Sequence, residues 1–343
     1  MEVGIITSAI KNIFVILSVV ILFTLFLTHP KIVSEAVSVT LSMCFIKLIP
    51  SIFPFMVISG FLINTLGEKN VRGKRNLDKC KIPYLTILLS WISGFVVGPK
   101  YLCQDNLEDD LTPLVFLCSN AGIGFVISYV GVTLWGSLTF GFYLYFIQIF
   151  WSVIIYLFVK NKTGKIVLEK RAIPLLTSLS STIQGSTMTM LNICGFTVFF
   201  SVISAIFSIF FSSEIILLSI SSAFEISSGI FSAVTSKSNV FCAFFTGFSI
   251  GFGGICMCMQ TFAVCGESNI NKQKFLLLKM LHGTLCGASS LIFVSVNKQE
   301  PLIQAYLDFN SSQSIISALV SALFLCSLLF LTKKYLKNKL YSI

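Results

Sequence analysis

The stretch Ser221-Ser-Ala-Phe-Glu-Ile-Ser-Ser-Gly-Ile230 places one carboxylate, that of Glu225, among small and hydroxyl side chains, with long apolar segments on both sides. A charge at membrane depth is costly and usually faces protein or a water-filled cavity, so Glu225 is a functional-site hypothesis by default. Its counterpart is Trp91-Ile-Ser-Gly-Phe-Val-Val-Gly-Pro-Lys100, a second glycine-broken apolar stretch that ends in a cation. Two interrupted apolar segments at matching places of two half-chains indicate a transporter binding site.

The composition is that of a helical membrane protein. Of 343 residues, 55% are hydrophobic and 11% are charged, and the mean hydropathy is +0.91. A soluble domain carries roughly 25% charged residues, so this chain has too few polar groups to cover a surface in water. Alternating strand patterns are absent, which argues against a membrane barrel. We therefore expect an all-α polytopic membrane protein in contact with the lipid bilayer.

The net charge of +10 follows the loops of such a protein rather than a nucleic-acid surface. Nineteen of the 24 Lys and Arg residues lie at Lys11, in three loops (69–81, 160–171 and 272–279) and in the tail at 333–339. Basic residues gather in cytoplasmic loops of membrane proteins. We therefore expect no nucleic-acid partner, and both chain termini in the cytoplasm.

No residue pattern indicates a metal, another cofactor or catalysis. The eleven cysteines are scattered, mostly within apolar segments, where cysteine behaves as a small apolar residue. His29 and His282 are isolated, and no Ser or Cys has the flanking glycines of a nucleophile elbow. We expect no enzyme, no metal and no cofactor, with H+ or Na+ left open as a coupling ion.

The basic loops constrain how often the chain crosses the membrane. Residues 67–81 carry six basic and two acidic residues, and residues 160–171 carry five and one, so both should be cytoplasmic. Three apolar stretches lie between them, at 83–99, 113–133 and 136–159. Three crossings would put the loops on opposite sides, so one stretch must turn back.

The first of these stretches is the one that turns back, because two glycines and a proline break it. Irregular backbone at membrane depth is tolerated where it is buried in protein or lines a cavity. We predict re-entrant hairpins at 83–103 and, by the same argument, at 214–233. An amphipathic segment, here called a lead-in, precedes the first crossing of each repeat. The lead-ins are residues 30–49, which we expect at the membrane interface, and residues 172–190. The hairpins enter from opposite sides, which predicts inverted repeats and about eight transmembrane helices in all.

This order divides the chain into five parts. They are an N-terminal transmembrane helix (1–30), a first repeat (31–159), a basic cytoplasmic linker (160–171), a second, inverted repeat (172–297), and a C-terminal transmembrane helix with a basic tail (298–343).

Five ordered motifs give the chain a family resemblance. They are Leu48-Ile-Pro-Ser-Ile-Phe-Pro-Phe55, Ser93-Gly-Phe-Val-Val-Gly-Pro-Lys100, Cys118-Ser-Asn120, Phe224-Glu-Ile-Ser-Ser-Gly229 and Phe252-Gly-Gly-Ile-Cys-Met-Cys-Met-Gln260. Over roughly residues 30 to 330, the chain resembles the sporulation stage V integral membrane proteins with paired nucleoside-recognition (gate) domains, which are similar in fold to concentrative nucleoside transporters. In the first hairpin it departs from the family pattern, which has a proline near Val96 and an alanine near Pro99.

The resemblance implies a function and a location. The best-understood members are thought to move dipicolinic acid from the mother cell across the outer forespore membrane of a spore-forming bacterium. The chain is therefore expected to be a transporter of a small organic anion, with two alternatives. One is an ion-coupled nucleoside or nucleobase carrier; the other is a non-transporting membrane scaffold for spore-envelope assembly. A homo-oligomer is left open.

Two ionisable residues head the candidate substrate site. Lys100 either pairs with a substrate carboxylate, helped by backbone N–H groups at a broken helix end, or anchors the hairpin at the cytoplasmic face by snorkelling. Glu225 either couples protons or donates from its protonated acid, or it is a structural partner of Lys100 or of backbone donors. An ionised Glu225 would repel a dianion, so its protonation matters to the transport hypothesis.

Seven further residues complete the predicted site. Ser119, Asn120, Ser227, Ser228 and Gln260 could donate or accept substrate hydrogen bonds, although as single residues they are better explained as polar contacts between helices. The other two are the hairpin glycines Gly98 and Gly229.

Overall fold

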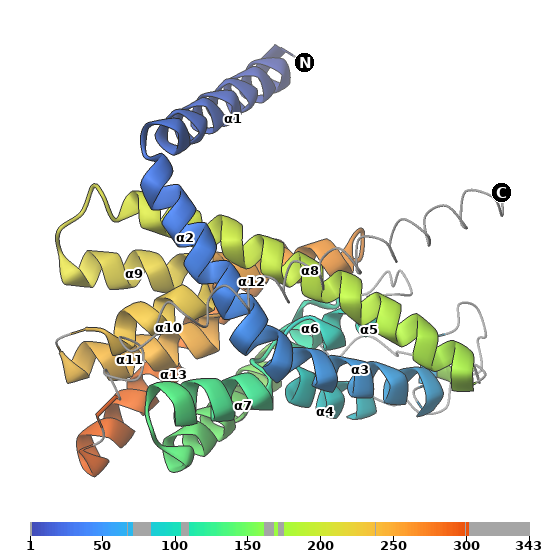
Figure 1. Ribbon diagram of the computed structural model, residues 1–343. Coiled ribbons are helices and arrows are strands. Elements are labelled where there is room, and N and C mark those ends of the chain that lie inside the picture. The colour runs from blue at the N-terminus through green and yellow to red at the C-terminus, as the bar shows by residue number, and fades with distance from the viewer. Residues whose placement is uncertain are drawn as a thin grey trace.

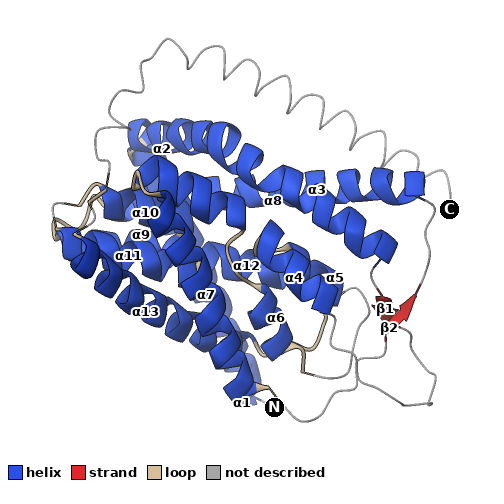
Figure 2. Cartoon of the chain, turned by 90° about the horizontal axis from the view of Figure 1, so that it is seen from below, coloured by secondary structure: helices blue, strands red, loops and turns tan. Residues whose placement is uncertain are grey.

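The computed structural model describes residues 2–66, 68–70, 84–103, 110–160, 168–170, 175–236, 238–298 and 300–301. Apart from one short ribbon, these residues form helices and their connections (Figures 1 and 2). The helices are α1 (Glu2–Thr28), α2 (Pro30–Met43), the π-type turn η1 (Cys44–Leu48), α3 (Ile49–Leu66), α4 (Tyr84–Ser93), α5 (Val97–Leu102), α6 (Thr112–Cys118), the π-type helix η2 (Gly124–Leu134), α7 (Leu138–Val159), α8 (Leu175–Phe207), α9 (Glu214–Phe224), α10 (Ile226–Val234), α11 (Asn239–Phe252), α12 (Gly254–Cys265) and α13 (Lys272–Asn297).

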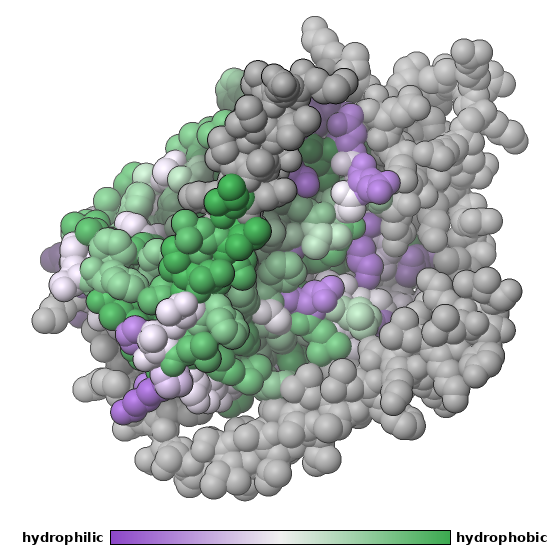
Figure 3. All heavy atoms as spheres, turned by 90° about the horizontal axis from the view of Figure 1, so that it is seen from above, coloured by the Kyte–Doolittle hydropathy of each residue, from purple (hydrophilic) through white to green (hydrophobic). Residues whose placement is uncertain are grey.

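The described residues contain five helical stretches that are long and apolar enough to cross a membrane. They are Pro30–Thr65, Leu138–Val159, Thr177–Phe207, Asn239–Cys265 and Lys272–Asn297. Large apolar side chains point outward from several helices, and they cover much of the face in Figure 3. An outward apolar surface of this extent fits contact with lipid. The predicted helix near 315–332 lies outside the described residues.

Both lead-ins differ from their prediction as separate segments. The first continues through η1 into α3, and the second forms the beginning of α8. The π-type turn explains the continuity of the first. Pro50 lacks an N–H and its ring would crowd the carbonyl four residues earlier, and a widened turn just before it relieves that conflict.

In each of the segments 83–103 and 214–233 the chain forms two short helices separated by a break, and their re-entry into the membrane stays a prediction. The first has legs α4 and α5, joined at Gly94, and the second has legs α9 and α10, joined at Glu225. The legs fold back on one another through glycine. A Cβ built on Gly98 would lie 2.5 Å from the Ser90 Cβ, and one on Gly229 would lie 2.6 Å from the Ser222 Cα. Only glycine allows this approach at both places.

A broken helix follows each hairpin and touches its tip. The first break separates α6 from η2, and a Cβ on Gly122 would lie 3.1 Å from backbone atoms of Ile92 and Ser93. The second break, between α11 and α12, has Gly253 and Gly254 at positive φ. A Cβ on Gly254 would lie 2.7 Å from the Phe224 carbonyl oxygen. Each half of the chain therefore contains the same pair: a hairpin with a broken helix across its tip.

Glycine also brings α13 against α11. A Cβ on Gly251 would lie 2.8 Å from the Cα of Gly283, and one on Gly247 would meet the Ser290 hydroxyl. Small residues at helix contacts let backbones approach closely in membrane proteins. This packing fixes α13 beside the broken helix of the second half (Figure 1).

A two-stranded antiparallel ribbon joins the first basic loop to the basic linker between the two halves (Figure 2). Strand β1 (Glu68–Asn70) pairs with β2 (Leu168–Lys170), with Lys69 opposite Glu169. The ribbon therefore brings a segment of the first basic loop beside a segment of the second.

Candidate functional site

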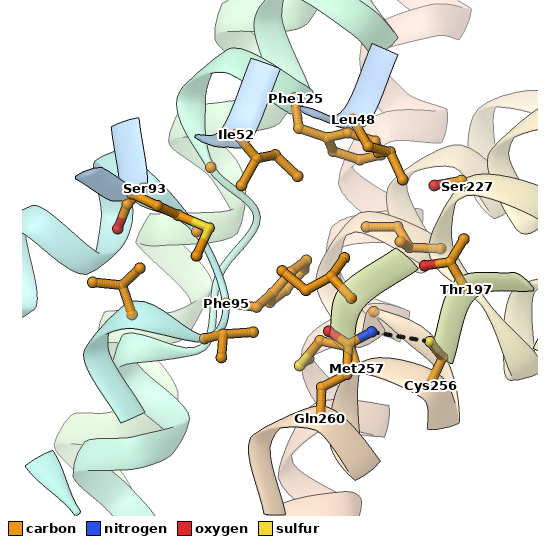
Figure 4. Close-up of a pocket in the computed structure, with 18 of the residues that line it drawn as sticks. Leu48, Ile52, Ser93, Phe95, Phe125, Thr197, Ser227, Cys256, Met257 and Gln260 are labelled. Carbon is orange, nitrogen blue, oxygen red and sulfur yellow. Dashed lines mark hydrogen bonds between the residues drawn. The ribbon is translucent and has the colours of Figure 1, made fainter. Parts of the chain in front are cut away.

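A small cavity lies where the helix breaks of the two halves meet (Figure 4). It is lined by the α4–α5 break, Gly122, the start of α10 and the start of α12, with α3 and α8 completing the wall. Its volume is about 50 Å³, enough for a few water molecules. Most of the wall is apolar. The hydroxyl, amide and carboxyl groups on it come from Ser93, Thr197, Glu225, Ser227 and Gln260.

Glu225 is the only carboxylate among the lining residues, and its side chain is 1% exposed. It occupies the break between α9 and α10 in extended conformation, and its Oε2 accepts a 2.7 Å hydrogen bond from the Ser228 backbone N–H. A carboxylate at a helix N-terminus is stabilised by the unpaired N–H groups and the helix dipole. The backbone donors that the sequence analysis left open as partners of Glu225 are therefore present.

Three helices begin at the cavity: α5, α10 and α12. α10 starts with the Glu225 cap, whereas the N-cap of α12 is Gly253, which has no side chain to accept from the helix N–H groups. Helix N-termini carry partial positive charge. The cavity thus combines one acid with the positive end of an uncapped helix.

Ser227 and Gln260, both predicted site residues, lie at this cavity. The Ser227 hydroxyl is buried and has no hydrogen-bond partner among the described residues. The Gln260 amide is within 3.2 Å of the Cys256 sulfur (Figure 4).

Lys100 lies elsewhere, on α5, and does not line the cavity. Its Nζ donates to the Gly185 carbonyl (3.1 Å) and to the Thr189 hydroxyl (3.3 Å), both on α8. The structure therefore does not pair Lys100 with Glu225. The sequence suggested such pairing because both residues follow a hairpin break, but the side chain of Lys100 points to the wall of α8.

Five other predicted residues also lie away from this cavity. The Ser119 hydroxyl donates to the Val115 carbonyl within α6, and Asn120 donates to Leu117 and Ser152. Gly98 and Gly229 lie where the legs of each hairpin pack together, and Ser228 lies on the far side of α10. For Asn120, which donates to Ser152 on α7, the geometry fits a polar contact between helices, whereas the Ser119 hydroxyl is bonded within its own helix.

Lys279 is the main feature that the sequence analysis missed. It was counted in the basic loop 272–279, but α13 already begins at Lys272, and Lys279 is completely buried two turns later. Its Nζ donates to the Ser119 carbonyl at 2.8 Å and lies 5.5 Å from the Phe95 ring centroid. Among the described residues it has no carboxylate partner within ion-pair distance.

Phe95 links that lysine to the cavity. It is the middle residue of the α4–α5 break and lines the cavity (Figure 4). The Lys279 Nζ lies over its ring, 5.5 Å from the ring centroid. Neither its position nor that of Thr197 on α8 could be read from the sequence, because both are ordinary members of apolar runs.

Comparison with known protein families, with curated proteins and with solved structures gave no match. In the part of the chain that the structure describes, no three His, Cys, Asp or Glu side chains group as ligands for a metal ion.

Proposed function

We propose that this protein is a membrane transporter that moves a small organic anion by alternating access, with dipicolinate as the first substrate to test. The observation that carries the proposal is the meeting of both hairpin tips and both broken helices at one cavity that holds a single carboxylate. Binding sites formed by discontinuous helices at the interface of two repeats are typical of secondary transporters.

The repetition of contacts supports inverted repeats. In each half, a hairpin glycine packs on a serine of the opposite leg, and the hairpin tip packs on a glycine of the following broken helix. In the proposed arrangement the two hairpins are re-entrant from opposite sides, and the chain has about eight transmembrane helices. The C-terminal one falls outside the described residues.

The ribbon β1·β2 supports the predicted orientation. Since its strands pair, the two basic loops that carry them lie at one side of the membrane. By the positive-inside rule that side is the cytoplasm. In line with the family resemblance, we propose that the protein lies in the outer forespore membrane, with its cytoplasmic side facing the mother cell.

The small volume of the cavity fits a state of the transport cycle without bound substrate. About 50 Å³ cannot hold an aromatic dicarboxylate, so the hairpins must separate to admit one. Glu225 would couple transport to protons. A dianion could bind beside the neutral, protonated acid, whereas the ionised carboxylate would repel it. Na+ is the alternative coupling ion, and we propose neither a cofactor nor a catalytic activity.

One observation favours a nucleoside or nucleobase as the alternative substrate. No Lys, Arg or His is among the residues that line the small cavity. Its wall instead carries the rings of Phe95 and Phe125, one amide and several hydroxyl groups. Aromatic faces with a few convergent polar groups suit an uncharged ring.

The test is uptake of labelled dipicolinate into proteoliposomes, with uridine as the comparison substrate. The variant Glu225→Gln keeps an oxygen that can accept from the Ser228 N–H, so it should fold but lose saturable dipicolinate uptake. The matched control is Glu214→Gln, at the start of the same hairpin, which should retain uptake. Saturable uridine uptake alone would favour the nucleoside carrier. Absence of both fluxes from folded protein would favour the scaffold.

A further inference from the structure

A second, larger cavity lies on the other side of the second hairpin, bounded by α2, α8, α9 and α10. Its volume is about 570 Å³, within the range of roughly 300–1,000 Å³ that is usual for ligand pockets. Figure 1 shows α2 lying beside α8, close to the hairpin. A molecule that is too large for the small cavity beside Glu225 would fit in this larger cavity.

The wall of this cavity is unusually rich in hydroxyl groups. Of its sixteen lining residues, eight are serines and one is a threonine, and no acidic residue lines it. In a chain with so apolar a surface, polar groups gathered on four helices, α2, α8, α9 and α10, indicate a water-filled space. Ser201 adds independent evidence: it is 7% exposed, lines the cavity, and its hydroxyl has no hydrogen-bond partner among the described residues.

Lys47 is the one charged residue on the wall. It belongs to the π-type turn η1 and lies near the middle of the 36-residue helical stretch Pro30–Thr65. Its ammonium group has no carboxylate or hydrogen-bond partner among the described residues. A cation in the middle of a spanning helix is expensive, and a water-filled cavity is where such a residue is found. π-type turns also occur often at functional sites.

Two elements, η1 and α10, line both cavities. On η1, Lys47 lines the larger cavity and Leu48 lines the small one. On α10, Ser228 lines the larger cavity and Ser227 lines the small one. The Ser228 N–H also donates to the Glu225 carboxylate, so a residue of the larger cavity is directly bonded to the acid of the small one.

We infer that the larger cavity is a water-filled vestibule in which Lys47 attracts the carboxylate group of a small organic anion before the anion reaches Glu225. The inference rests on the proposed transport function for its substrate, but the wetness and charge of the vestibule can be measured without transport.

The experiment labels a cysteine in the vestibule with two membrane-impermeant methanethiosulfonates, one anionic and one cationic. Ser201→Cys is suitable because the serine makes no hydrogen bond that the change would break. Relative to their rates with free glutathione, the anionic reagent should react with Ser201→Cys faster than the cationic one. The added change Lys47→Gln should remove that preference, whereas the matched change Lys31→Gln, on the same helix outside the cavity, should leave it.

The controls fix the interpretation. Wild-type protein gives the labelling of the native cysteines, and Ile58→Cys, exposed on the apolar surface of α3, should stay unlabelled. Absence of labelling at Ser201→Cys in folded protein would overturn the vestibule. Labelling without a charge preference, or a preference that survives Lys47→Gln, would overturn the role of Lys47. The uptake assay is separate: if wild type transports neither substrate, the proposed function fails whatever the labelling result.

Discussion

Lys279 carries a charge into the interior without a carboxylate to balance it. Burying an ammonium group is costly, and the 2.8 Å hydrogen bond to the Ser119 carbonyl and the rings of Phe95 and Phe116 compensate only partly. The carbonyl follows the C-terminal end of α6, where a cation is favoured by the helix dipole. Lys279 therefore ties α13 to the break of the first half.

This arrangement predicts opposite behaviour for two substitutions. Lys279→Met keeps the volume and removes the buried charge, so the free energy of unfolding should be unchanged or higher. Lys279→Ala leaves a void and should be less stable than the Met variant by about 2–5 kcal/mol. Thermal unfolding in detergent measures both, with Lys272→Met, in the exposed first turn of α13, as control. Unfolding of the Met variant would mean that the cation itself is required by the fold.

Asp110 forms the one ion pair among the described residues, outside the membrane-spanning helices. Its carboxylate lies 3.4 Å from the Lys274 Nζ and accepts the Thr112 N–H at 3.0 Å. Burial raises the pKa of Asp110, but the hydrogen bonds from Thr112 and the charge of Lys274 outweigh it, so the pKa lies below the ordinary value.

The direction of that shift fixes the pH dependence. A carboxyl group with a lower pKa in the folded state contributes stability above its unfolded pKa, about 3.9, and loses it as the pH falls through the folded value. Asp110→Asn should therefore be less stable than wild type at pH 7, by about 0.2–1 kcal/mol for a partly exposed pair. The difference should vanish in acid, as measured by unfolding between pH 7 and pH 2. A difference that persisted at pH 2 would assign it to packing.

At the scale of elements, the hairpins depend on glycine. Gly98 and Gly229 each let the two legs approach so closely that an added methyl group would overlap the other leg. Gly98→Ala and Gly229→Ala should each destabilise the protein by about 1–3 kcal/mol, because the legs must move apart.

Gly195 supplies the matched control. It lies within α8 with no atom within 4 Å of a built Cβ, so Gly195→Ala should stabilise the helix by up to about 1 kcal/mol. Melting temperatures of the three variants in one detergent test the prediction. Equal effects at all three positions would contradict the tight hairpin packing.

At the scale of the whole molecule, the ribbon joins the first repeat to the basic linker that precedes the second repeat. Directly opposite residues in an antiparallel pair have Cβ atoms about 4.5–5.5 Å apart, so Lys69→Cys and Glu169→Cys should form a disulfide under mild oxidation in membranes. The pair Lys69→Cys with Asn239→Cys is the control and should not cross-link. Absence of the first cross-link would remove the structural support for placing both basic loops on one side.

Much of the architecture could be predicted from local sequence. Gly94, Gly98 and Pro99 indicated the break in the first segment, since few other residues interrupt a helix so strongly. Ser227, Ser228 and Gly229 indicated the break in the second. Glu225 could be singled out for an equally local reason. An isolated carboxylate among apolar and small residues requires hydrogen-bond donors or a water-filled cavity around it. The continuity of Pro30–Thr65 was not predicted, because the widened turn that admits Pro50 depends on backbone geometry rather than on residue type.

The sequence by itself determined an all-helical chain with membrane-spanning segments and two interrupted hairpins, because hydrophobicity and helix breaking are properties of neighbouring residues. Only the tertiary structure decided which polar groups share a space. It placed Ser227 and Gln260 beside Glu225, turned Lys100 toward α8, buried Lys279 behind Phe95, and gathered serines around Lys47. Those relations depend on how helices distant in the sequence rotate and pack, and the steric room that glycine leaves between them sets that packing.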